Sequence, residues 1–373
     1  MHRGKGEEEV NLSVGIVGLP NVGKSTLFNA LLKKQQALAA NYPFATIEPN
    51  VGVVPVPDER LVKLAEITKT EEKLDSLPPI KSAMVNFVDI AGLVKGASEG
   101  AGLGNKFLSH IREVSVIVHV VRAFSDDNVI REGSIDPKSD YETIETELML
   151  ADLQSIEKAI SNKKQMISKS TLEKVQQLLN AGTSVRSGDF SEEEQVEVMQ
   201  LFLISAKKEL IVLNVSEEDY SEEKIPGIIE KYAGLLGVSA DILTVVCAKI
   251  EEELSTLTLE EQTEYLSGIG IHQSGLERVI KKAYDTLGLI SFLTCGEKEV
   301  KAWTIEKGMS AQNAAGVIHT DFIKKFIKAE IVSFDDFVVN SGWKGSREVG
   351  KARLEGRDYV MHDGDVVEFK IGA

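Results

Sequence analysis

Residues 18–25 read GLPNVGKS, and this stretch decides the fold because it matches the pattern G-x-x-x-x-G-K-[ST]. The residues before it, LSVGIVG at 12–18, form an apolar run that is typical of a buried parallel strand. The residues after it, STLFNALLK, have helical spacing. A strand, this loop and a helix in that order indicate a loop that binds the phosphates of a nucleotide.

The residue types in the loop suit phosphate chemistry. Gly18 and Gly23 allow backbone geometry that a Cβ atom would obstruct, so the loop N–H groups and the helix N-terminus can surround a β-phosphate. Lys24 is expected to bring its ammonium to the β- and γ-phosphates and to act in catalysis. Ser25 is expected to ligate Mg²⁺ through its hydroxyl. The other loop residues expected to contact the nucleotide are Asn21, Val22 and Thr26.

Two later segments supply further candidates. In VDIAG, residues 88–92, Asp89 ends an apolar strand, where its carboxylate can hold Mg²⁺. Gly92 follows at the D-x-x-G spacing, so its N–H can meet the γ-phosphate. Thr46 in NYPFATIEPN is expected to be the second hydroxyl on Mg²⁺, on a loop ordered by the γ-phosphate. The alternative for Thr46 is an ordinary turn threonine.

The remaining apolar runs predict an α/β fold. Further buried strands are expected within residues 82–92, 114–124, 209–216 and 242–250. Helical patterns separate most of them, which indicates a doubly wound, mostly parallel sheet with right-handed crossovers.

More than 80 residues lie between the strands that end near Phe124 and start near Glu209, although a crossover needs only one helix. Three segments of this gap have amphipathic helical spacing, at residues 141–167, 171–182 and 191–206. We expect an inserted helical domain, in the form of a coiled-coil-like hairpin. A few extra surface helices are the alternative.

The pattern changes after Leu289. Short strands are expected at residues 291–296, 299–305 and 366–372, with one helix over 310–326 and a turn in HDGDVVEF before the last strand. This pattern predicts a small α+β unit of about 80 residues.

Composition narrows the class of protein. The chain has 43% hydrophobic and 27% charged residues, as a globular protein has, and no run of about 18 apolar residues that would predict a membrane span. Its polar start, MHRGKGEEEV, lacks the apolar core of a secretory signal. Cys247 and Cys295 have no metal-binding spacing, so we expect reduced thiols in a cytoplasmic protein.

The net charge of −16 argues against general binding of nucleic acid, and no DNA partner is expected. The charge is uneven, because residues 291–373 carry 12 Lys and Arg against 13 Asp and Glu. This nearly neutral part could approach RNA locally. A surface of mixed charge without a partner is the alternative.

Residues 87–113, FVDIAGLVKGASEGAGLGNKFLSHIRE, resemble the second switch of the Obg-related, translation-factor-class P-loop NTPases. Together with LNVSE at 213–217, the inserted helices and the C-terminal unit, they make the chain similar to the Obg-like ATPase (YchF) family over essentially all residues beyond about 10. The resemblance implies an OBG-type nucleotide-binding domain at 11–125 and 206–290, the inserted helical domain at 126–205 and a ubiquitin-like TGS domain at 291–373.

The base that this protein reads depends on the stretch NVSE. GTPases of this class use NKxD, whose Asp accepts hydrogen bonds from guanine. Here Asn214 is kept, Val215 replaces the Lys that packs over the base, and Glu217 replaces the Asp. Adenine lacks the two donors that the carboxylate would need, so these changes favour ATP, and the resemblance implies the same preference. Glu217 facing solvent, with GTP still bound, is the alternative.

One later loop is a weaker candidate for the base pocket. The segment 245–253 resembles the last guanine-recognition loop, and the backbone around Ala248 and Lys249 is expected to line the pocket.

Hydrolysis needs a group that orients water. Ras-like enzymes use the Gln after DxxG, but this position is Leu93, which cannot polarise water. His110 is the candidate, because it follows a Gly-rich segment and a neutral imidazole could orient water. A His that only caps or packs its helix is the alternative. Asn21 is also expected to help hold K⁺ beside the phosphates, with a turn-forming Asn as the alternative.

The leading interpretation is an ATP-hydrolysing molecular switch. The resemblance implies association with the ribosome or ribosomal RNA and a role in translation or stress response. A GTP-dependent ribosome assembly factor and a non-enzymatic nucleotide-dependent scaffold are the alternatives. A small-molecule kinase is the least supported, because the sequence has no visible acceptor pocket.

Overall fold

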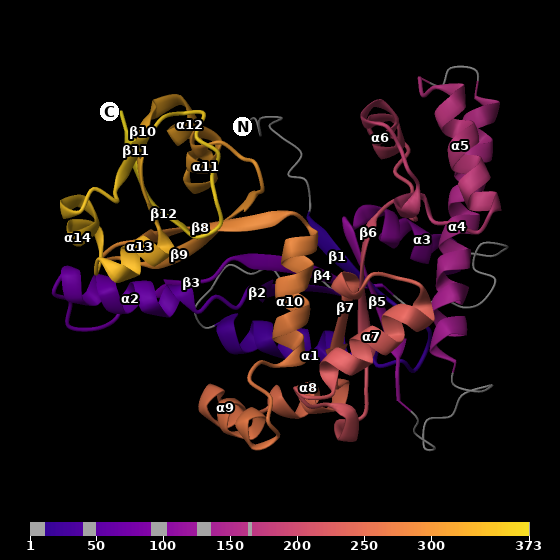
Figure 1. Ribbon diagram of the computed structural model, residues 1–373, viewed down its shortest axis with the longest axis horizontal. Helices are drawn as coiled ribbons and strands as arrows, with labels where there is room; N and C mark the ends of the chain where they lie inside the picture. The colour runs from indigo at the N-terminus through magenta and orange to yellow at the C-terminus, as the bar shows by residue number, and fades with distance from the viewer. Residues whose placement is uncertain (1–11, 40–49, 91–102, 125–135, 163–165, 373) are drawn as a thin grey trace, which may run out of the picture. The chain divides into compact units, whose positions relative to one another are not determined.

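The computed structural model describes residues 12–39, 50–90, 103–124, 136–162 and 166–372. The chain separates into two compact units (Figure 1). The first contains the residues up to Val54 together with Asn86–Thr286, and the second contains Pro55–Val85 together with Leu287–Ala373. The described candidates for the nucleotide site belong to the first unit.

A six-stranded sheet forms the centre of the first unit within the described residues. Its order is β2 (Val51–Pro55), β4 (Met84–Asp89), β1 (Ser13–Val17), β5 (Val116–Arg122), β6 (Lys208–Asn214) and β7 (Leu243–Val246). The pairs β1–β4, β1–β5, β5–β6 and β6–β7 are parallel. Strands β1, β5 and β7 are buried at every residue, as the continuous apolar runs predict for a sheet covered on both faces. The predicted α/β class with a P-loop-type sheet is confirmed.

Helices connect these strands and cover the sheet. They are α1 (Lys24–Ala39), α3 (Leu103–Glu113), α7 (Ile225–Leu236), α8 (Ala248–Leu254), α9 (Leu259–Gly268) and α10 (Gly275–Thr286), with the short helices η2 (Glu217–Asp219) and η3 (Ala240–Ile242). The strand predicted at 242–250 is shorter than expected, because the chain enters α8 at Ala248. Parallel strands bring their carboxyl ends to one edge, so Val17, Asp89 and Asn214 end at the same edge of the sheet.

The described residues between β5 and β6 form mainly helices. These are α4 (Pro137–Ser161), α5 (Lys169–Asn180), η1 (Val185–Ser187) and α6 (Glu192–Met199). Helix α6 ends earlier than residue 206, where the sequence pattern predicted its end. The reason is the buried Asp152, whose carboxylate accepts hydrogen bonds from the N–H groups of Ile204 (2.9 Å) and Ser205 (2.7 Å). These bonds hold the chain in a non-helical path before β6.

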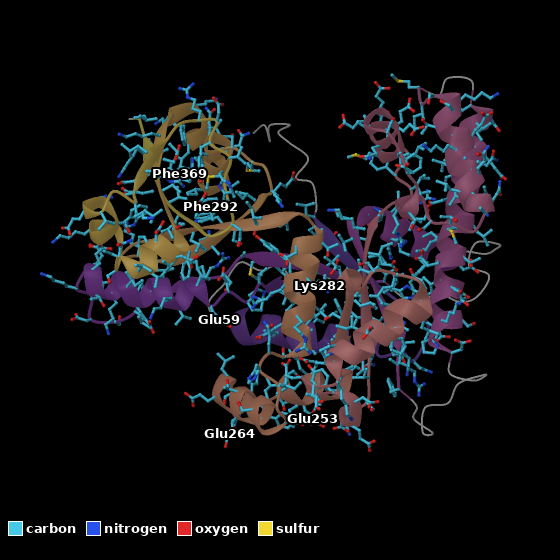
Figure 2. The ribbon with its side chains drawn as sticks, in the orientation of Figure 1. Glu59, Glu253, Glu264, Lys282, Phe292 and Phe369 are labelled. Atoms are coloured by element: carbon cyan, nitrogen blue, oxygen red, sulfur yellow. The ribbon has the colours of Figure 1, made fainter. Side chains whose placement is uncertain are left out.

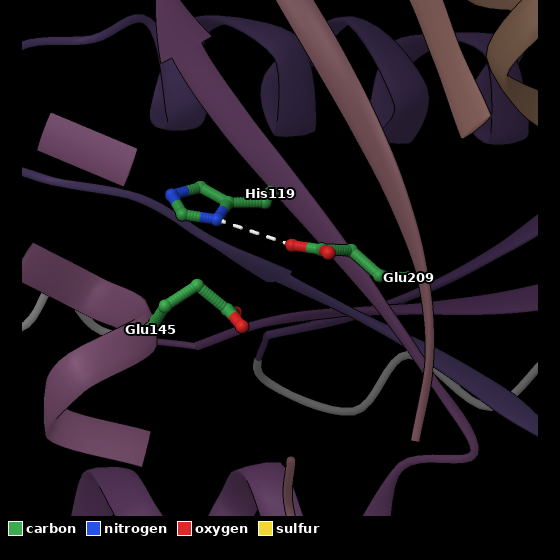
Figure 3. A group of neighbouring side chains, drawn as sticks. All are labelled: His119, Glu145 and Glu209. Atoms are coloured by element: carbon green, nitrogen blue, oxygen red, sulfur yellow. Dashed lines mark ion pairs between the residues drawn. The ribbon is translucent and has the colours of Figure 1, made fainter. Parts of the chain in front are cut away.

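A buried polar cluster joins these helices to the sheet. His119 on β5 and Glu209 on β6 face Glu145 of α4, and His119 Nδ1 lies 3.4 Å from Glu209 Oε1 (Figure 3). Arg186 donates to Glu209 (2.7 Å) and to both oxygens of Glu145 (3.1 Å). Burial, followed by the charge of Glu209, raises the pKa of Glu145 to about 7. The three residues are close enough to share a metal ion, but the guanidinium already supplies the positive charge there, so we assign the cluster a structural role.

The second unit has its own sheet. Its order is β11 (Arg353–Glu355), β10 (Phe326–Ser333), β12 (Asp365–Ile371), β8 (Leu289–Cys295), β9 (Val300–Glu306) and β3 (Ile80–Lys81). Its helices are α2 (Arg60–Glu71), α11 (Ala311–Ile318), α12 (Asp321–Lys325), α13 (Phe334–Val339) and α14 (Trp343–Glu348). Phe292 and Phe369 pack edge to face at 5.7 Å between ring centroids within this unit (Figure 2). A second, C-terminal sheet domain is therefore present, as the sequence pattern predicted.

Two features of this unit differ from the sequence prediction. The single helix predicted over 310–326 is wrong: α11 ends at Ile318, α12 is short, and the chain enters β10 at Phe326. Pairing of β10 with β12 and the contact of Phe326 with Phe369 override the helical spacing.

The second difference concerns residues 55–85, which the predicted boundaries placed in the nucleotide-binding domain. They join the second unit, because β3 pairs in parallel with β9 and the Glu71 carboxylate accepts hydrogen bonds from the N–H groups of Trp343 (3.1 Å) and Lys344 (2.6 Å).

Within the described ranges, no helix is both long enough and apolar enough to cross a membrane.

Candidate functional site: a phosphate-binding loop

The loop between β1 and α1 has the backbone that its glycines permit. Gly18 has φ +153° and Gly23 has φ +100°, values that residues with a Cβ rarely adopt. A Cβ on Gly18 would lie 2.6 Å from the carbonyl oxygen of Val120 on the neighbouring strand β5. The glycines therefore let the loop pass close to β5 and turn into α1.

Lys24 lies at the first position of α1 and is 8% exposed. Its Nζ donates a hydrogen bond to the carbonyl oxygen of Leu19, 2.7 Å away, which holds the ammonium over the loop. Burial lowers the pKa of Lys24 to about 8, and the negative charge of Asp89 opposes this shift. An ammonium in this state lacks most of its solvent, so an anionic ligand could stabilise it strongly.

Asp89 and Ser25 are the described candidates for a cation site. Asp89 is half-buried at the end of β4, in register with Ile16 next to the loop. Burial raises its pKa, and Lys24 opposes this shift. Ser25 is exposed in the first turn of α1. A carboxylate and a hydroxyl are the hard oxygen ligands that Mg²⁺ prefers, so these residues fit the ion. Thr46 and Gly92 lie outside the described residues.

Asn214 joins the phosphate-binding loop to the loop after β7. Its Nδ2 donates to the carbonyl oxygen of Val22 (2.9 Å), and its Oδ1 accepts from the N–H of Ala248 (3.0 Å). The side chain is 4% exposed. A Cβ on Gly23 would collide with the Asn214 amide, so the glycine is needed for this contact as well as for its φ. The N–H of Ala248 is thus engaged, which limits any base contact by Ala248 to its other atoms.

Glu217 has an ion-pair partner that the sequence analysis did not identify. Lys249 Nζ lies 2.7 Å from Glu217 Oε2, and this hydrogen bond raises the pKa of Lys249. Both side chains are exposed. The available signal was that both residues follow directly after the apolar runs of β6 and β7, because adjacent parallel strands bring the segments after their carboxyl ends together.

The side chain of Val215 is not available to contact a nucleotide base. Its side chain is 3% exposed and packs in an apolar cluster with Cys247 and Ile250. A contact of Val215 with a nucleotide would have to come from its backbone.

His110 and Asn21 are both exposed. His110 lies in the last turn of α3, whose buried residues include Phe107 and Ile111. Asn21 has φ +62°, the left-handed conformation that Asn tolerates in turns, as the turn-forming alternative requires. Thr26 is half-buried in the first turn of α1.

Comparison with known proteins identifies the family. A family model described as "50S ribosome-binding GTPase" matches residues 13–228. A model for the C-terminal part of YchF GTPases, described as "Protein of unknown function (DUF933)", matches residues 289–372. The chain is 48% identical to the "Ribosome-binding ATPase YchF" of Bacillus subtilis over 372 residues, which cover 96% of this chain and 99% of that relative. This chain belongs to the YchF/Obg-like ATPase family.

Other YchF relatives match over nearly the full length. The "Ribosome-binding ATPase YchF" of Escherichia coli O157:H7 is 46% identical, covering 95% of this chain and 98% of the relative. A structure of the Schizosaccharomyces pombe YchF GTPase is similar with a TM-score of 0.84 and 39% identity, covering 98% of this chain and 99% of that one.

The names of the relatives differ in the nucleotide that they mention. The Schizosaccharomyces pombe protein "Obg-like ATPase 1" is 39% identical to this chain, covering 97% of it and 95% of the relative, and the solved structure from the same species is described as a GTPase.

Proposed function

We propose that this chain is a cytoplasmic, ATP-hydrolysing molecular switch that binds the ribosome and regulates translation or a stress response. The observation that carries the proposal is the buried ammonium of Lys24, held over a phosphate-binding loop beside Asp89. The names of relatives 46–48% identical, ribosome-binding ATPases, support the activity and the partner.

The ion that accompanies the nucleotide is proposed to be Mg²⁺. Ser25 and Asp89 would hold it with Thr46, and the bound ion would neutralise charge on the β- and γ-phosphates. Lys24 would add its own charge to the same phosphates, while Gly92 would donate its N–H to the γ-phosphate. Asn21 is proposed to help hold K⁺, since Leu93 leaves the catalytic site without a polar residue after DxxG.

ATP is the proposed nucleotide because Glu217 is already engaged. Guanine would have to compete with the ammonium of Lys249 for this carboxylate, whereas adenine requires no acceptor at that edge. The contacts proposed for the base are Asn214, Val215 through its backbone, Glu217 and Ala248.

A molecular switch needs parts that respond to the nucleotide state and contact the partner. We propose that the inserted helices at 126–205 and a TGS domain within 291–373 report the nucleotide state to the partner, while 11–125 and 206–290 supply most of the nucleotide-binding domain. The cluster of Glu145, Arg186 and Glu209 would transmit a shift of β6 to the inserted helices.

Multiple-turnover hydrolysis by the purified full-length chain tests the activity. ATP is expected to be hydrolysed repeatedly, and GTP is expected to compete at least tenfold more weakly for a fluorescent adenine-nucleotide analogue. Tighter binding of GTP would identify a GTP-driven factor, and retention of ATP without turnover would identify a scaffold. Sedimentation with Bacillus subtilis ribosomes, with a non-hydrolysable ATP analogue against ADP, tests the partner, because a switch must bind differently in the two states.

His110→Ala tests the proposed role of the exposed histidine. We expect kcat to fall at least tenfold while the affinity for ATP stays within about twofold, because general acid–base groups act mainly in the transition state. Ser109→Ala, at the neighbouring exposed position of α3, is the matched control. Equal turnover by His110→Ala and the wild type would reject the role and leave a packing histidine.

A further inference from the structure

Helix α6 and the residues after it are apolar on two faces. Val198 and Leu203 lie in the core of the inserted helices with Leu172 and Val175 of α5. The other face is apolar too: Val196, Met199 and Phe202 have exposed fractions of 57%, 73% and 75%. Large apolar side chains that are exposed close to one another are normally covered by a partner surface, and no described residue of this chain covers these three.

The three exposed residues lie close together along the chain. Val196 and Met199 are three positions apart on α6, so their side chains are neighbours on the helix surface. The N–H of Phe202 donates to the carbonyl oxygen of Met199 at 3.4 Å, which places Phe202 directly after them. Phe202 also has φ +49°, a conformation that is costly for an aromatic residue. Phe202 thus combines a strained backbone with a large apolar ring that is exposed to water.

The charges beside this surface are acidic. Asp189, Glu192 and Glu193 are exposed, and none of them forms an ion pair with another described residue. The neighbouring acids face inward, since Glu194 pairs with Lys174 at 2.7 Å and Glu197 accepts from Ser168. First-turn carboxylates stabilise the helix dipole, which accounts for Glu192 and Glu193, but the dipole does not account for the exposed apolar residues.

We propose that the exposed apolar surface formed by Val196 and Met199 of α6 and by Phe202 after it is a docking surface for a basic protein that inserts apolar side chains between its Lys and Arg residues. The inference rests on the proposed function and deepens it, because it assigns this contact to a ribosomal protein. The charge of this face disfavours RNA, since RNA phosphates would meet the three exposed carboxylates of Asp189, Glu192 and Glu193. In Figure 1, α6 lies next to α5 and apart from the strands of the sheet.

Sedimentation with Bacillus subtilis ribosomes tests the surface. Met199→Ser combined with Phe202→Ser, in the full-length chain, is expected to weaken ribosome binding at least tenfold while ATP turnover in the absence of ribosomes stays unchanged. Leu259→Ser removes a similarly exposed apolar side chain (78%) of the first unit, outside the inserted helices, and serves as the control. Equal binding by both variants and the wild type would overturn the docking surface but not the proposed function. A wild type that does not sediment with ribosomes would refute both.

A photo-crosslinking phenylalanine analogue at position 202 identifies the partner class. The expected product is a crosslink to a ribosomal protein, which is destroyed by protease and survives ribonuclease. A crosslink that ribonuclease removes would show that RNA covers this face and would overturn the proposal. Absence of any crosslink from a chain that sediments with ribosomes would also overturn it.

Discussion

ATP affinity is expected to fall about a hundredfold when Lys24 is replaced by alanine. The ammonium is buried over the loop and would form charge-assisted hydrogen bonds to the phosphates, and losing such bonds costs about 3 kcal/mol, or roughly a hundredfold in Kd. Isothermal titration with ATP and Mg²⁺ measures the loss. Lys33→Ala, on the same helix, is the matched control and is expected to stay within about twofold.

The pH dependence of ATP binding distinguishes a direct contact of the Lys24 ammonium with the phosphates from a general loss of structure in Lys24→Ala. Without nucleotide the pKa of Lys24 is about 8, and the negative phosphates would raise it in the complex. Binding therefore requires uptake of a proton above pH 8. The affinity of the wild type is expected to be flat from pH 7 to 7.5 and then to fall as the pH rises, by up to about tenfold per unit. The decline should be absent in Lys24→Ala; an identical decline in both proteins would assign it to another group.

Asn214→Ala is expected to damage both the nucleotide site and the fold. The variant leaves the Val22 carbonyl and the Ala248 N–H buried without their partner, and each unpaired group costs about 1–3 kcal/mol. We expect the free energy of unfolding in urea to fall by about 2–4 kcal/mol and the Kd for ATP to rise at least tenfold, because the phosphate-binding loop loses its connection to the loop after β7.

A second variant keeps half of this connection. The carboxylate of Asn214→Asp can still accept from Ala248 but cannot donate to Val22, so its stability and affinity should lie between those of the wild type and the alanine variant. Asn29→Ala, at an exposed position of α1, is the control. If Asn214→Ala binds ATP as the wild type does, the connection between the loops is not needed for the site.

The sequence predicted the site best where one continuous segment builds it. Gly18, Gly23 and Lys24 are neighbours along the chain, and their residue types are required by the loop itself, so a strand, a loop and a helix could be assigned without tertiary information. Asn214 lies at the end of β6, because an apolar run that ends in a polar residue predicts the edge of the sheet. Its two hydrogen-bond partners could not be predicted, since they lie far away along the chain.

The fold was harder to predict wherever a contact from another element overrides the local pattern. Residues 310–326 have helical spacing, yet Phe326 begins a strand because β12 supplies its partners. Helix α6 stops at Met199 because the carboxylate of Asp152 binds the backbone of residues 204 and 205. Both β12 and Asp152 lie far along the chain from the segment whose structure they change.

The sequence by itself determined the chemistry of the phosphate-binding loop and the order of strands and helices around it, because hydrophobic spacing and glycine geometry act over a few residues. Only the tertiary structure decided that Lys249 pairs with Glu217, that Arg186 lies between Glu145 and Glu209, and that β3 belongs to the second sheet. The physical reason is that charge pairs and strand pairing form between groups that the fold brings together, and their strength depends on distance in space and on burial rather than on separation along the chain.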